Sequence, residues 1–212
     1  MLLFAHTGIT LGMAWLVDNA LARRSQSRIE DKIGREEASQ GTQEKRGAYS
    51  QGNIHVLGQT IDYRLVLIGS MLPDIIDKPL GTFILQETIS NGRVYAHTLL
   101  FTTMLLLLGL YLQRSGKIGM LVVALGSLVH LVLDSMWNAP STLFWPILGW
   151  SFPRHDVSDW IPELIEGLGT NAWVYVPEIV GFLIIAGCAI HLLRSKGIIH
   201  FLTTGHFKLS GV

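Results

Sequence analysis

An apolar helical segment that carries two ionisable side chains places the strongest constraint on this chain. The segment covers residues 118–137, is rich in Leu and Val, and contains His130 and Asp134. A spacing of four residues stacks two side chains on one face of a helix, one turn apart. Burying two such groups among apolar side chains is costly unless they bind each other or a ligand. We therefore expect His130 and Asp134 to belong to a functional site.

The composition indicates a membrane protein that forms a single domain over residues 1–212. Hydrophobic residues make up 49% of the chain, charged residues only 15%, and the mean hydropathy is +0.39. That balance is too apolar for an ordinary soluble domain. The formal net charge is zero, so no nucleic-acid partner is expected.

The apolar segments predict an all-α fold, a polytopic integral membrane helix bundle with about five membrane-embedded helices. We expect these helices at residues 1–21, 61–77, 96–113, 118–137 and 174–193. The first segment lacks the basic start and cleavage site of a secretory signal, so we interpret it as a retained transmembrane helix. A polar loop, helical in part, is expected at 23–60, and a Trp-rich interfacial loop at 138–173.

The distribution of positive charge predicts the topology. Twelve of the 16 Lys and Arg residues lie in three places: 22–59, 114–117 and the tail after 193. The positive-inside rule puts those regions in the cytoplasm and the N-terminus outside. In this multi-pass arrangement, ionisable residues from different helices reach one level near the extracytoplasmic face. They are His6, Asp74, Asp77, His97, His130, Asp134 and Glu178.

Histidine and carboxylate side chains from several helices form the ligand set of a divalent-metal site. Zinc is the ion we expect first, with manganese as an alternative, and so many ligands would suit more than one ion. Such ions activate water for attack on phosphoesters. The pattern therefore predicts a metal-dependent hydrolase of the phosphoesterase type.

The order of these motifs resembles the YdjM-like family of membrane-bound, metal-dependent hydrolases. The resemblance is carried by His6, the stretch LPDIID at 72–77, Arg93 with His97-Thr98, and His130 with Asp134. That family is thought to be related to the zinc-dependent phospholipase C and single-strand nuclease superfamily. The resemblance implies metal ligands at His6, Asp74, Asp77, His97, His130, Asp134 and Glu178. Lys78 departs from the family, which often has a histidine at this position.

The chemistry of such a centre suggests roles for three of the residues already named. Asp77 or Glu178 would orient or deprotonate a metal-bound water, and Arg93 would bind a phosphate oxygen. The substrate would be a phospholipid or lipid-linked phosphate taken from membrane lipid, or a small phosphoester. Two alternatives stay open: an ion- or proton-coupled transport protein that uses His and Asp as its path, and a non-catalytic membrane protein with a stabilising metal.

Overall fold

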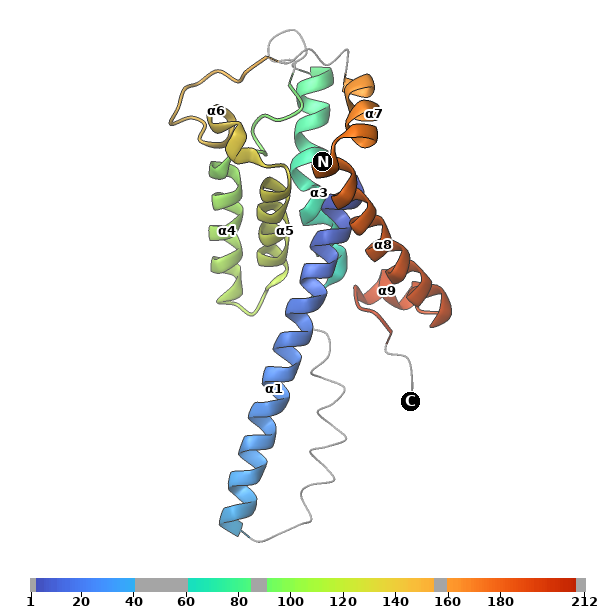
Figure 1. Cartoon of the computed structure of the whole chain (residues 1–212). Coiled ribbons are helices and arrows are strands. Elements are labelled where there is room, and N and C mark those ends of the chain that lie inside the picture. The colour runs from blue at the N-terminus through green and yellow to red at the C-terminus, as the bar shows by residue number, and fades with distance from the viewer. Residues whose placement is uncertain (1–2, 41–60, 85–90, 155–159, 209–212) are drawn as a thin grey trace.

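The structure is a computed structural model that describes residues 3–40, 61–84, 91–154 and 160–208 (Figure 1). All regular structure within these ranges is helical, and they contain no strand. The all-α prediction is therefore confirmed. The elements are η1 (Ala5–Ile9), α1 (Thr10–Gln40), α3 (Tyr63–Pro79), η3 (Leu80–Ile84), α4 (Leu99–Gln113), α5 (Gly119–Leu133), η4 (Met136–Asn138), α6 (Pro140–Leu143), α7 (Trp160–Thr170), α8 (Ala172–Arg194) and α9 (Ile198–Thr204).

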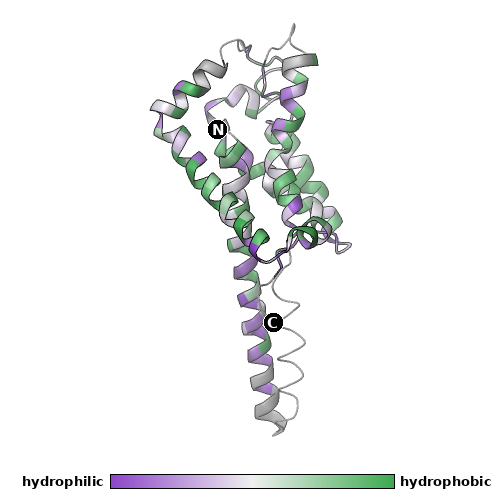
Figure 2. Cartoon of the chain, turned by 90° about the vertical axis from the view of Figure 1, so that its right-hand side faces the viewer, coloured by the Kyte–Doolittle hydropathy of each residue, from purple (hydrophilic) through white to green (hydrophobic). Residues whose placement is uncertain are grey.

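The first helix is longer than the expected segment 1–21. Backbone angles at Thr10 are helical, so η1 continues directly into α1, which extends beyond the bundle as a polar arm (Figures 1 and 2). The segment from 23 to 40 is rich in good helix formers and has no proline to end the helix. A bond from Gln26 to Glu30 (3.2 Å) is one of its i,i+4 contacts. The rest of the predicted polar loop lies outside the described residues.

Helix α3 packs closely against α5 through small residues. A Cβ added to Gly69 would lie 2.5 Å from the carbonyl oxygen of Val123, so the two backbones are nearly in contact. Pro73 has no N–H to donate to Gly69 four residues earlier, and the Ser127 hydroxyl donates to that carbonyl instead (3.1 Å). The proline is thereby accommodated inside the helix, which continues to Pro79 and carries Asp74 and Asp77 on its last turns.

Helix α8 is the one described helix that is long and apolar enough to cross a membrane. Many of its apolar side chains are exposed, including Phe182 and Leu183. The green colour along this helix marks its apolar residues (Figure 2). Helices α4 and α5 are also apolar but have only 15 residues each, fewer than the roughly 20 needed to span a bilayer. The bounds of α8, Ala172–Arg194, agree with the predicted span 174–193. The five-span arrangement stays a prediction.

The C-terminal helix α9 is attached to the start of α3. Arg64 donates to the carbonyl oxygens of Leu202 (2.8 Å) and Thr203 (3.1 Å) at the end of α9. The same guanidinium binds the Asp62 carboxylate through Nε (3.1 Å) and Nη2 (2.7 Å). This contact lies at the end of α3 opposite to Asp74 and Asp77, and Figure 1 shows α9 beside that end of the bundle.

The close contact between α3 and α5 predicts that an added methyl group lowers stability at Gly69 more than at a glycine without close neighbours. Gly69→Ala should lower the melting temperature of the detergent-purified protein, because steric overlap costs about 1–3 kcal/mol. The gain in helix propensity, about 0.5–1 kcal/mol, offsets only part of this. Gly187→Ala in α8 is the control, since no described atom lies within 4 Å of its added Cβ. Equal melting temperatures for the two variants would contradict the close crossing.

Candidate metal centre

Residues from three helices and one loop converge on a buried cluster of His and Asp side chains. His6 comes from η1, Asp74 from α3, His97 from the turn before α4, and His130 and Asp134 from the end of α5. The three histidines are completely buried, and the two carboxylate side chains are 8% and 3% exposed. The structure thus brings together five of the predicted ligands, as their common level in the expected topology required.

Asp77 fixes the position and tautomer of His97. Its carboxylate accepts hydrogen bonds from the backbone N–H groups of Val94 (2.7 Å), Ala96 (2.9 Å) and His97 (3.0 Å). It also lies 2.7 Å from Nδ1 of His97, and a carboxylate can only accept there, so Nδ1 carries the proton. The lone pair of the His97 ring is therefore on Nε2, which faces the cluster.

The Ser70 carbonyl group does the same for His130. Nδ1 of His130 lies 2.7 Å from that oxygen, and because a carbonyl only accepts, Nδ1 must be the donor. The neutral His130 ring therefore also has its lone pair on Nε2. This orientation by a partner behind the ring is how proteins usually prepare a histidine to bind a metal.

The two Nε2 atoms face each other across 3.3 Å. Asp74 Oδ1 lies 3.6 Å from Nε2 of His97 and 3.8 Å from Nε2 of His130. Asp134 Oδ2 lies 3.8 Å from Nε2 of His97. Four electron-pair donors thus converge in a buried space, an arrangement that is repulsive without a cation between them.

His6 adds a fifth side chain to the cluster. Its ring stacks on His130 with centroids 4.0 Å apart, and its Nε2 lies 3.1 Å from Asp134 Oδ1. Its Nδ1 is buried and has no hydrogen-bond partner among the described residues. Two sets of side chains are close enough to hold a metal ion: His6 with Asp74 and His130, and His97 with His130 and Asp134.

Two cations bind the cluster carboxylates. Lys78 Nζ lies 2.7 Å from Asp74 Oδ2, one helical turn along α3. Arg93 Nε lies 2.8 Å from Asp134 Oδ2. The Lys78 and Arg93 side chains are 60% and 45% exposed, in contrast to the buried carboxylates that they contact.

Glu178 and Asp77 have other partners than the sequence interpretation gave them. Glu178 Oε2 accepts hydrogen bonds from the backbone N–H groups of Phe4 (3.1 Å) and Ala5 (3.2 Å) and so holds the helix that carries His6. Asp77 is occupied by three backbone N–H groups and the ring of His97. Both carboxylates are adjacent to the cluster, but neither is in the two sets that could hold a metal ion.

Two contributors were missed or undervalued by sequence reasoning. The Ser70 carbonyl has no signal in the sequence, because any residue supplies that group. Lys78 was considered only as the loss of a histidine, although its spacing of four residues from Asp74 predicts a contact on one helix face.

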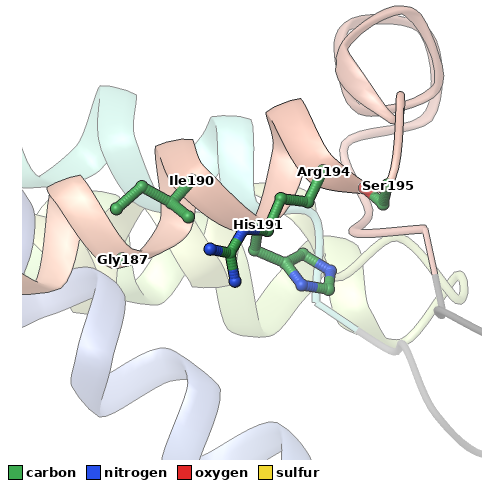
Figure 3. A pocket seen from close by; sticks show the side chains of 5 residues that line it. All are labelled: Gly187, Ile190, His191, Arg194 and Ser195. Carbon is green, nitrogen blue, oxygen red and sulfur yellow. The ribbon is translucent and has the colours of Figure 1, made fainter.

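A separate pocket of about 370 Å³ lies at the opposite end of α8. It is lined by Gly187, Ile190, His191, Arg194 and Ser195 (Figure 3). The pocket residues lie about two and a half to five helical turns along α8 from Glu178, so the pocket is distinct from the His–Asp cluster.

The fold and the cluster define a helical membrane protein with a candidate metal centre, and a comparison with protein families agrees with this class. The family described as YdjM inner membrane protein matches residues 43–195. The match covers more than half of the chain, so the chain belongs to the YdjM inner membrane protein family, which supports a membrane location. Every cluster residue except His6 lies within the match. Searches of curated proteins and of solved structures found no match.

The contacts of Asp77 predict that this side chain stabilises the protein. Asp77→Ala leaves three backbone N–H groups and a ring N–H without their acceptor, at about 1–3 kcal/mol for each group that stays buried. We expect a clear drop in melting temperature. Asp31→Ala removes the same charge from an exposed position on α1 and is the control. If the two variants melted alike, the proposed hydrogen-bond network around Asp77 would be wrong.

Proposed function

We propose that this protein is a membrane-bound hydrolase that uses a divalent metal ion to cleave a phosphoester. The observation that carries the proposal is the 3.3 Å approach of the His97 and His130 Nε2 atoms. Both rings have their Nδ1 protons directed away from the cluster, to Asp77 and to Ser70. Nitrogen lone pairs that are held in this way are the ligands that zinc and similar ions prefer.

A shared proton is the simplest alternative occupant, and the geometry of the two rings favours a metal ion over it. A single proton is bound by one of the two Nε2 atoms and leaves the other lone pair directed at it. A divalent ion gives both nitrogen lone pairs a partner, and Asp74 and Asp134 can add oxygen ligands. His6 lies beside these ligands, and its buried Nδ1 has no hydrogen-bond partner among the described residues.

We infer a single ion at this centre. The two candidate sets share His130. Only Nε2 of His130 is available, because Nδ1 donates to Ser70, so the ring serves one ion at a time. His97, His130, Asp74 and Asp134 would hold that ion, with His6 beside them. When bound, it would activate a water molecule and polarise a phosphoryl oxygen.

The chain's own groups would orient the ion's ligands and the substrate. Asp77 holds the His97 ring with its lone pair inward, and Glu178 holds the helix that carries His6. Because Asp77 already accepts four hydrogen bonds, its role is positioning and not proton transfer. Arg93 reaches the cluster from its exposed side, where a substrate would enter.

A lipid substrate is favoured by the aromatic residues beside the Arg93 loop. Tyr95 contacts Trp145 and Phe152 edge to face, and Trp145 contacts Trp150. Trp150 is 80% exposed and Ile147 is 84% exposed. Such side chains suit the headgroup layer of a membrane, which fits a multi-pass bundle with the centre on its extracytoplasmic side. The supposed relationship to the phospholipase C and nuclease superfamily agrees with this substrate class but rests on resemblance alone.

Metal content tests the proposal. Elemental analysis of the detergent-purified protein should find about one zinc or similar ion per chain. His130→Ala should reduce that content toward zero, because it removes a nitrogen ligand. The control is His200→Ala, which changes an exposed histidine on α9. Wild-type protein that binds no divalent ion after reconstitution would contradict the metal centre.

Turnover is tested separately, with the metal-loaded protein and a panel of phosphomonoesters and phosphodiesters in mixed micelles. We expect hydrolysis by wild type and by His200→Ala, and none by His130→Ala. Retained metal without hydrolysis would favour the non-catalytic interpretation. Metal-dependent ion flux in sealed vesicles would favour transport.

A further inference from the structure

We propose that Lys78 and Arg93 form an anion clamp at the entrance of the metal centre and select substrates whose phosphoryl group carries a net negative charge. The inference rests on the proposed function, because it assigns the substrate class of the same centre. It gives Lys78 a role in substrate recognition.

The clamp residues are the exposed members of an otherwise buried group. Lys78 and Arg93 are about half exposed, whereas the side chains of Asp74 and Asp134 are 8% and 3% exposed. A ligand that approaches the cluster from solvent or from the headgroup layer therefore meets the two cations before it meets the carboxylates.

The two cations lie on adjacent parts of the structure. Lys78 is on the last turns of α3, and a Cβ added to Gly92 would lie 3.8 Å from Lys78 Cγ. The Lys78 stem thus passes beside the residue that precedes Arg93. The carboxylates that they bind both approach His97 Nε2, at 3.6 and 3.8 Å. A phosphoryl group bound at the solvent side of His97 Nε2 would therefore lie between Lys78 and Arg93.

Each of the two ion pairs joins a partly exposed cation to a buried carboxylate of the cluster. A metal ion bound by Asp74 and Asp134 would compete with Lys78 and Arg93 for the negative charge of these two carboxylates. The loaded centre would then present two cations at its entrance, one a point charge and one a planar fork that fits phosphate oxygens.

This charge arrangement predicts the substrate class. A phosphomonoester or a pyrophosphate group keeps negative charge on its outer oxygens while another oxygen faces the metal ion. An uncharged ester or amide gains nothing from Lys78 and Arg93. The shared chemistry is therefore an anionic phosphoryl group, supplied either by a lipid headgroup or by a soluble phosphate compound.

Pyrophosphate binding to the metal-loaded, full-length protein tests the clamp by calorimetry in detergent. Lys78→Gln and Arg93→Gln should each weaken binding about tenfold or more, since each removes one charge-assisted contact. Lys78→Arg should restore most of the affinity, which a purely structural role for Lys78 does not predict. Lys117→Gln, in the exposed turn between α4 and α5, is the control and should bind as wild type.

Metal content, measured on every sample, separates the possible failures. Variants that retain the ion and bind pyrophosphate as tightly as wild type would overturn the clamp while leaving the proposed function in place. A wild type without bound metal would overturn both. Competition identifies the source of the anion: phosphatidic acid in the micelles displaces pyrophosphate if a lipid headgroup is the natural ligand, and soluble phosphomonoesters alone displace it otherwise.

Discussion

The buried carboxylate of Asp77 is the interaction on which the rest of the centre depends. It collects three backbone N–H groups from the turn before α4 and the Nδ1 proton of His97. These bonds hold the turn against α3 and direct the His97 lone pair at His130. A buried carboxylate is tolerated because its charge is met by four donors. Without them the turn would lose its anchor and His97 its orientation.

Helix α3 supplies the rest of the scaffold within two turns. Gly69 allows α5 to approach closely, Ser70 orients His130, and Asp74 faces both imidazoles. Pro73 lies among them and leaves the Gly69 carbonyl for the hydroxyl of Ser127. The same segment therefore sets the helix packing and the chemistry, so a change in packing at α3 is expected to disturb the cluster as well.

The sequence was sufficient to predict the helical class and the members of the cluster. His130 and Asp134 were recognisable because ionisable groups are costly to bury in an apolar helix unless they bind a partner. The predicted topology placed His6, Asp74 and His97 at the same level. The partners of Asp77 and Glu178 were not predictable, because backbone N–H groups leave no signature in a sequence. The helical arm of α1 was underestimated because its polar residues suit a loop and an exposed helix equally well. Lys78 was undervalued because the comparison with the family motif noted only that a histidine is missing at this position.

The most direct test of the central claim is X-ray absorption at the zinc edge, on protein loaded with one equivalent of zinc. Inward-facing Nε2 atoms of His97 and His130 predict at least two imidazole ligands, with Zn–N distances of about 2.0–2.1 Å. His97→Ala should reduce the imidazole number by one. A first shell made only of oxygen, with no imidazole scattering, would contradict the assignment of this cluster as a metal centre.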